Sequence, residues 1–249
     1  MTAVCRHVAY LGPPTTLGGL LMDPPHSLCV QSYAPRRQRH GTVNADGFGA
    51  GWYVDRRAEP VRYRRAQSIW SDQSFASLAP TIASGCVLGA VRSATPGFPA
   101  DESCAAPFAE GPWLFSHNGA TAEPALVRKA LRDAVDWVPD ALAPVDSAFL
   151  FGLAVARWRA GASLGTGLAG VVRDVATAGD GRVTLLAADG ERVAGVTWGE
   201  PMYVRRHHGA VVVASEPYDD EPGWEEVPDR HLVQAENSAV TVTPIEEAT

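Results

Sequence analysis

Almost at its amino terminus the chain reads Val4-Cys5-Arg6-His7-Val8-Ala9-Tyr10-Leu11-Gly12. Chain ends are usually polar and poorly ordered, whereas residues 5–11 have the apolar pattern of a buried strand. The position gives Cys5 a chemical option. If the working chain begins at Cys5, its own α-amine, with an ordinary pKa near ~7.7–8.0, can take the proton of its thiol. We therefore predict that Cys5 is an N-terminal nucleophile at the start of a buried strand.

The composition is that of an ordinary globular protein, with 249 residues of which 46% are hydrophobic and 20% charged. Because strand patterns fill much of the chain and no linker stands out, we predict one domain. The net charge of −7 and the lack of a long basic run argue against nucleic acid as a partner. No apolar stretch reaches the roughly 18 residues of a membrane span, and the first residues do not resemble a signal peptide. We expect a cytoplasmic protein without a membrane partner.

The four cysteines, at positions 5, 29, 86 and 104, do not have the spacing of a metal site. In the cytoplasm they should be reduced thiols. The pair His207-His208 is a poor metal site as well, because adjacent residues of a strand point to opposite faces. We expect neither a metal nor another cofactor.

Hydrophobic periodicity predicts strands followed by helices and then antiparallel hairpins, which is typical of an α+β layered domain. Gly12-Pro13-Pro14 predicts a turn followed by a loop through Pro25, and Asn44-Ala45-Asp46-Gly47 predicts another turn. Residues 28–33 fit either a short helix or a strand. The predicted helices cover residues 72–83, 124–135, 146–160 and 164–178. Two of them are expected to be amphipathic: 146–160, and 124–135 with Leu126, Ala130, Leu131 and Ala134 on one face. The predicted strands cover residues 5–11, 48–54, 87–94, 113–116, 183–188, 193–198, 202–206 and 210–214, with two short ones near Leu232 and Val240.

Three further stretches carry side chains that suit one task. Arg92 ends an apolar strand, Asn118-Gly119 follows another, and Asp146 begins a helix. Each has an ordinary explanation: a surface cation, a type I′ turn or a helix N-cap. Together they fit a γ-glutamyl group: Arg92 would bind its carboxylate, Asp146 its ammonium, and Asn118 with the Gly119 N–H the oxyanion that forms at its carbonyl.

These motifs resemble the glutaminase domain of the class II, or N-terminal nucleophile, glutamine amidotransferases. The resemblance is carried by Cys5, Asn44-Ala45-Asp46-Gly47-Phe48-Gly49, Arg92 to Thr95, Phe115 to Gly119 and Asp146-Ser147. It implies an α+β fold, a four-layer αββα sandwich. It also implies Cys5, Asn118 and Gly119 as catalytic residues, and Arg92, Asp146, Thr95 and His117 as residues that bind the substrate.

Within that family the chain resembles the standalone hydrolases of ergothioneine biosynthesis. The similarity covers residues 5–12, 34–53, 214–217 and 227–230. It implies a small-molecule substrate, γ-glutamyl-hercynylcysteine S-oxide, whose γ-glutamyl amide bond would be hydrolysed through a cysteine thioester.

Two features depart from the family's pattern. Ala148 stands where the family usually has an acid after the Asp-Ser pair, and residues 1–4 precede the cysteine and block its α-amine. Our hypothesis is that the domain spans residues 5–249 and that residues 1–4 are a misplaced start, with Val4 as the true initiator, or a removed prefix. Three alternatives stay open: a glutaminase subunit that supplies ammonia to a separate synthase, an inactive γ-glutamyl-binding protein, and a hydrolase that uses Thr2.

Overall fold

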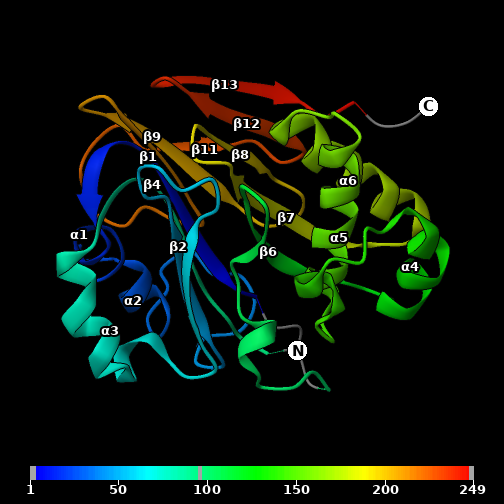
Figure 1. Cartoon of the computed structure of the whole chain (residues 1–249), viewed down its shortest axis with the longest axis horizontal. Helices are drawn as coiled ribbons and strands as arrows, with labels where there is room; N and C mark the ends of the chain where they lie inside the picture. The colour runs from blue at the N-terminus through cyan, green and yellow to red at the C-terminus, as the bar shows by residue number, and fades with distance from the viewer. Residues whose placement is uncertain (1–3, 95–96, 247–249) are drawn as a thin grey trace.

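The computed structural model describes residues 4–94 and 97–246. Two antiparallel sheets are stacked face to face between two groups of helices (Figure 1). One sheet contains β1 (Arg6–Thr16), β2 (Phe48–Trp52), β3 (Val61–Arg65), β4 (Ala83–Val91), β9 (Met202–His207), β10 (Ala210–Ala214) and β11 (Glu225–Val227). The other contains β5 (Phe108–Glu110), β6 (Trp113–Thr121), β7 (Gly181–Ala188), β8 (Arg192–Val196), β12 (His231–Glu236) and β13 (Ala239–Pro244). The predicted four-layer αββα sandwich is confirmed.

The order of the strands puts β1 inside the first sheet. That order is β11-β9-β10-β1-β4-β2-β3, and the second sheet runs β13-β12-β8-β7-β6-β5. Successive β1 side chains face different layers. Ala9 belongs to the apolar core between the sheets, whereas Val8 and Tyr10 pack with the helices on the outer side. The predicted buried strand at residues 5–11 therefore forms, beginning at Arg6.

The helices divide between the two outer faces. The first sheet is covered by α1 (Leu17–Leu21), α2 (Leu28–Gln31) and α3 (Gln73–Leu78), and the second by α4 (Pro124–Leu131), α5 (Asp146–Arg159) and α6 (Leu164–Ala178) (Figure 1). Short 3₁₀ turns lie at Ile69–Ser71, Ala79–Thr81, Glu102–Cys104, Arg132–Ala134 and Pro139–Leu142. Within the described ranges no helix has the length and apolar character needed to cross a membrane.

Two local predictions about β1 and its surroundings were wrong. Gly12-Pro13-Pro14 does not form a turn but continues β1, with a shift in the β1–β4 register between Leu11 and Thr15. Proline lacks the N–H that a regular ladder needs, so the irregularity accommodates both prolines within the strand. The predicted loop after it contains α1, whose N-cap Thr16 accepts a hydrogen bond from the Gly19 N–H.

Two helices are buried differently from what their amphipathic patterns predict. In α5 every residue from Ala148 to Val155 is buried, because β6, α6 and the turn at Pro139–Leu142 surround it. It is a core helix, not an amphipathic one. In α4 only Val127 is buried, and Leu126 is 51% exposed, so the face named from periodicity does not point inward.

Candidate active site

Cys5 directly precedes β1, which lies beside β4 in its own sheet and faces β6 of the other sheet. Arg6 pairs with Val91 in the β1–β4 ladder, which brings Cys5 beside the residues that follow β4. Across the sandwich, the His7 ring lies 3.2 Å from Ser116 on β6, between Nδ1 and Oγ. Cys5 is partly exposed, and it lines a small cavity with Arg92, His117 and Ser147. The topology therefore gathers four of the sequence-predicted motifs at one end of the sandwich.

Charges of both signs act on the Cys5 thiol. Burial raises its pKa, and the Asp146 carboxylate raises it further. A hydrogen bond from the Ser93 backbone and the positive charges of Arg92 and Arg6 oppose this rise. The balance leaves the thiol pKa above its ordinary value, so the thiol is protonated at neutral pH and needs a base to become a nucleophile.

The Arg92 side chain is nearly buried and is held by backbone carbonyls. Its Nη1 donates to the Asp46 carbonyl at 3.3 Å and to the Pro99 carbonyl at 3.0 Å. The Asp46 carboxylate in turn accepts from the Ala94 N–H at 2.8 Å. The predicted turn before β2 thus fixes the position of the guanidinium. Thr95, the next predicted site residue, lies outside the described residues.

Asp146 begins α5 but does not cap it, because the N-cap residue is Val145. One carboxylate oxygen of Asp146 accepts from the Ser147 N–H at 2.9 Å, and the other accepts from the Thr121 N–H at 3.4 Å. The carboxylate is half-buried beside the end of β6. Two backbone donors therefore orient it without neutralising its charge.

Asn118 and Gly119 lie within β6 and not in a hairpin turn. They stand opposite Thr184 and Val183 of β7. Asn118 is fully buried, and neither its Nδ2 nor its Oδ1 has a hydrogen-bond partner among the described residues. Buried polar atoms without partners are rare in folded proteins. The amide is therefore available to a ligand.

Gly119 occupies a position that only glycine fits. Its φ is +143°, and a Cβ there would lie 2.0 Å from the Arg182 carbonyl oxygen. Because Gly119 has no side chain, the β7 backbone at Arg182 can lie close to β6 next to Asn118.

His117 uses both ring nitrogens inside the protein. Nε2 lies 3.2 Å from the Arg182 carbonyl, and Nδ1 lies 3.0 Å from the Ser147 hydroxyl. A carbonyl oxygen only accepts, so Nε2 carries the hydrogen and Nδ1 accepts from Ser147. His117 thereby ties the beginning of α5 to β6 and β7.

Several buried polar residues around Cys5 were not predicted as site residues. They are Arg6, His7, Asn44, Glu200 and Glu216. Glu200 follows Trp198-Gly199 after a predicted strand, and Glu216 follows another strand in Ser215-Glu216-Pro217. Glu200 and Glu216 could have been found from this pattern, an acidic residue shortly after an apolar strand.

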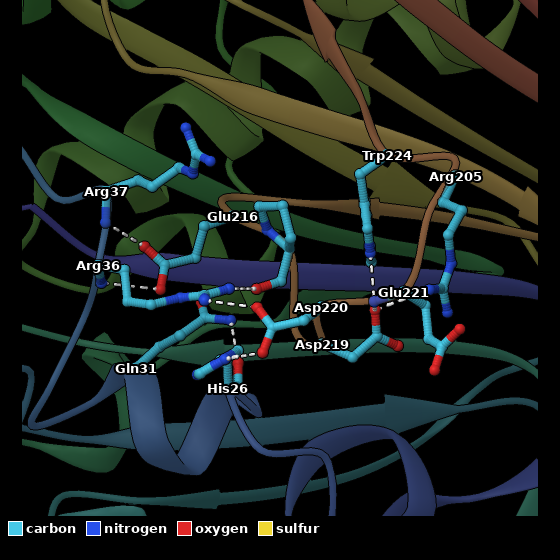
Figure 2. A network of polar contacts seen from close by, with 11 residues as sticks. His26, Gln31, Arg36, Arg37, Arg205, Glu216, Asp219, Asp220, Glu221 and Trp224 are labelled. Carbon is cyan, nitrogen blue, oxygen red and sulfur yellow. Dashed lines mark hydrogen bonds and ion pairs between the residues drawn. The ribbon is translucent and has the colours of Figure 1, made fainter.

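Glu216 fastens the segment that leads to Asn44. Its two carboxylate oxygens accept from the backbone N–H groups of Arg36, at 3.0 Å, and Arg37, at 2.7 Å. Nearby, Asp220 binds the Arg36 guanidinium at 2.8 Å and the His26 ring at 2.9 Å, as Figure 2 shows. These contacts join the loop after α2 to the turn after β10.

Comparison with known proteins agrees with this geometry. The family model for class II glutamine amidotransferases matches residues 15–210. A γ-glutamyl-hercynylcysteine sulfoxide hydrolase of Mycolicibacterium smegmatis is 45% identical over 97% of this chain and 100% of its own length. The protein of the same name from Mycobacterium tuberculosis (strain CDC 1551 / Oshkosh) is 42% identical over 98% of each chain.

Solved structures share the fold. A class II glutamine aminotransferase domain protein from Silicibacter pomeroyi superimposes with a TM-score of 0.70 at 22% identity, over 97% of this chain and 100% of that one. A phosphoribosylpyrophosphate amidotransferase from B. subtilis gives a TM-score of 0.67 at 14% identity, over 97% of this chain and 49% of that one. The family match and the similarity to two relatives over almost the whole chain show that this protein belongs to the class II glutamine amidotransferase family.

Proposed function

We propose that this protein hydrolyses the γ-glutamyl amide bond of γ-glutamyl-hercynylcysteine sulfoxide, releasing glutamate and hercynylcysteine sulfoxide. The observation that carries the proposal is the cavity that Cys5 shares with Arg92, His117 and Ser147, where the Arg92 guanidinium and the Asp146 carboxylate both act on the Cys5 thiol. Asn118, next to His117 in β6, adds a buried amide that has no partner among the described residues. The names of the relatives at 45% and 42% identity support this choice of substrate.

The glutamyl end of the substrate carries an α-carboxylate and an α-ammonium. In our proposal Arg92 binds the carboxylate and Asp146 binds the ammonium, because their charges are complementary and both are anchored by backbone groups. Holding both charges fixes the γ-carbonyl over Cys5 and converts binding into orientation. Thr95 is proposed as a further contact on the resemblance to the family alone.

The chemical steps are an acyl transfer to sulfur and a hydrolysis. The Cys5 α-amine takes the thiol proton, and Sγ attacks the γ-carbon, forming an oxyanion that the Asn118 amide and the Gly119 N–H stabilise. The amine then gives that proton to the leaving nitrogen as the C–N bond breaks. Water adds to the thioester with the amine as base, and the proton it takes returns to sulfur as the C–S bond breaks. Glutamate leaves and the free cysteine is restored.

His117 has a positioning role in this scheme. Both of its ring nitrogens are occupied by Ser147 and the Arg182 carbonyl, so it holds Asp146 in place by fixing the first turn of α5. A direct contact with substrate would require it to give up one of these bonds.

The proposed active chain is a single domain that begins at Cys5. With residues 1–4 attached, the nitrogen of Cys5 is an amide and cannot act as a base. We place the enzyme in the cytoplasm, where its free cysteines stay reduced, and assign it no nucleic acid or membrane partner.

Two preparations test the function. One begins at Cys5 after removal of an initiator methionine, and the other retains residues 1–4, with intact mass verifying each. We expect the first to release glutamate from γ-glutamyl-hercynylcysteine sulfoxide faster than from glutamine, and the second and a Cys5→Ala control to be inactive. Equal activity with residues 1–4 retained would overturn the role of the α-amine. Release of glutamate from glutamine alone would favour a glutaminase subunit instead.

A further inference from the structure

Arg6 at the start of β1 and two buried side chains connected with it, Asn44 and Glu200, carry polar atoms without hydrogen-bond partners among the described residues. Arg6, Asn44 and Glu200 are each at most 2% exposed. Within the described part of the chain, Arg6 Nη1 and Nη2, Asn44 Oδ1 and Glu200 Oε2 have no hydrogen-bond partner. Leaving such atoms unsatisfied is costly, above all for charged groups. These atoms are therefore left for a ligand that supplies both an acceptor and a donor.

Glu200 is held rigidly in its position between β8 and β9. The Thr184 hydroxyl donates to the Glu200 carbonyl at 2.9 Å and accepts from the Glu200 N–H at 3.3 Å. One carboxylate oxygen accepts from Arg182 Nη1 at 2.8 Å. The backbone and Oε1 are thus fixed, and Oε2 remains for another donor.

Among the described residues, Arg6 is anchored through one side-chain nitrogen only. Its Nε donates to Gln38 Oε1 at 3.2 Å, and the same oxygen accepts from Asn44 Nδ2 at 3.0 Å. Burial lowers the pKa of Arg6, whereas Glu216, Glu200 and Cys5 act electrostatically in the opposite direction. The guanidinium is therefore close enough to Glu200 and Cys5 to interact electrostatically with both.

The strand order places Glu200 and Glu216 on the side of β1 away from Arg92. In the sheet order β9-β10-β1-β4, Arg92 directly follows β4. Glu200 precedes β9, and Glu216 follows β10, on the other side of β1. In the facing sheet, Thr184, which fixes Glu200, stands opposite Asn118. A substrate with its glutamyl end at Arg92 and its carbonyl at Asn118 directs its leaving half toward Glu200.

The chemistry of the proposed leaving half matches what the site offers. Its carbon next to the scissile nitrogen bears a carboxylate, and its far end is a trimethylated histidine with a quaternary ammonium and an imidazole N–H. Ammonia, the leaving group of glutamine, has neither feature. A site with two guanidinium donors and one carboxylate oxygen is complementary to the first leaving group and not to the second.

Resting on the proposed function, we infer that Arg6 and Glu200 form the subsite for the leaving half of the substrate. Arg6 Nη1 and Nη2 bind the carboxylate beside the scissile bond, and Glu200 Oε2 accepts from the imidazole N–H. The subsite determines specificity, because it favours a zwitterionic leaving group over ammonia.

The test compares a charged leaving group with an uncharged one. The substrates are γ-glutamyl-hercynylcysteine sulfoxide and γ-glutamyl-p-nitroanilide, and the variants are Glu200→Gln and Arg6→Met in the chain that begins at Cys5. Glu236→Gln is the matched control, since Glu236 is an exposed carboxylate that pairs with Arg192 at the start of β8, at the other end of that strand from Glu200. We expect each site variant to lower the ratio of kcat/KM for the sulfoxide to that for the anilide by about tenfold or more, mainly through KM.

An unchanged ratio, or equal losses on both substrates, would overturn the inference and assign Arg6 and Glu200 a structural role. If Arg6→Met does not fold, Glu200→Gln decides the question. The proposed function fails in a different way: the unmodified enzyme would cleave the anilide but not the sulfoxide. In that event γ-glutamylcysteine and γ-glutamylcysteamine, which differ by one carboxylate, test the subsite, and Arg6→Met should abolish any preference for the first. If that preference persists in Arg6→Met, the Arg6 part of the inference is wrong.

Discussion

Asn118 stands directly opposite Thr184 in the ladder between β6 and β7, in the interior of a strand. Its side chain is fully buried and unpartnered within the described residues. A ladder fixes a side chain more firmly than a turn does, and a preorganised donor is what an oxyanion requires. In the proposed mechanism, this pairing therefore keeps the buried Asn118 amide in position for the oxyanion, which exists only during the reaction.

Replacing Asn118 by alanine should lower kcat by 10²- to 10³-fold, about 2.7–4 kcal/mol in the barrier, with little change in KM. The free energy of unfolding should change little, because the side-chain amide that is removed makes no hydrogen bond within the described structure. Steady-state kinetics and urea unfolding measure the two effects. A raised KM with normal kcat would instead mean that Asn118 binds the ground state.

Gly119→Ala should destabilise the protein and abolish turnover, because its Cβ would overlap the Arg182 carbonyl oxygen at 2.0 Å. Gly161→Ala is the matched control: Gly161 also has a positive φ, +93°, but nothing within 4 Å of a Cβ. The control should lose about 1–2 kcal/mol from the backbone conformation alone. Gly119→Ala should lose roughly 1–3 kcal/mol more from overpacking. Equal losses in urea unfolding would show that β7 moves away freely.

Arg92→Lys should lower kcat/KM on any γ-glutamyl substrate by about tenfold or more, although the charge is kept. The Arg92 guanidinium reaches the Asp46 and Pro99 carbonyls, and in the proposed function its other nitrogens bind the substrate carboxylate. A lysine ammonium has no planar fork with which to do both. The loss should be similar for the sulfoxide and the anilide, since both share the glutamyl end. A loss confined to one of them would argue against the carboxylate role.

The sequence predicts the layers of the fold and several residues of the candidate site better than it predicts local backbone geometry. Cys5, Arg92 and Asp146 are recognisable because each begins or ends an element that periodicity can identify. The Asn118-Gly119 pair is a strong turn signal, yet pairing with β7 overrides it. That partner strand is distant in the sequence, so no local pattern reports it.

The buried charges escape prediction for the same reason. Arg6 and Glu200 are ordinary surface residue types, and the strand order β9-β10-β1 brings them together in the interior. Helix α5 shows the converse error. Its sequence contains small and apolar residues on every side, and burial by elements on all sides turns a predicted amphipathic helix into a core helix.

Glu216→Gln should destabilise the fold by roughly 1.5–3 kcal/mol, because one of the two oxygens that accept from the Arg36 and Arg37 N–H groups becomes an NH₂ donor. Asp220→Asn is the comparison, since Asp220 is 73% exposed and its ion pairs are solvent-screened. It should change stability by less than about 1 kcal/mol. Chemical denaturation of both variants gives the difference. A large effect at Asp220 and none at Glu216 would mean that the outer pairs, not the buried carboxylate, hold the loop.

His7 should make the protein less stable as the pH falls below neutrality. Burial, together with the nearby His117 and Arg6, lowers the pKa of His7 from 6.5 to about 3. Between these values the unfolded chain binds a proton that the folded protein does not, so unfolding is favoured as the pH falls. The loss should reach about 2–3 kcal/mol at pH 4.5 relative to pH 7.

Carboxylates titrate over the same range, so the measurement compares urea unfolding of the unmodified protein with that of His7→Gln. Between pH 7 and pH 4.5 the free energy of unfolding of the variant should fall by about 2–3 kcal/mol less than that of the unmodified protein, whatever its value at pH 7. His208→Gln serves as the control because that ring is exposed. Parallel pH dependences for the unmodified protein and His7→Gln would show that His7 is protonated in the folded state.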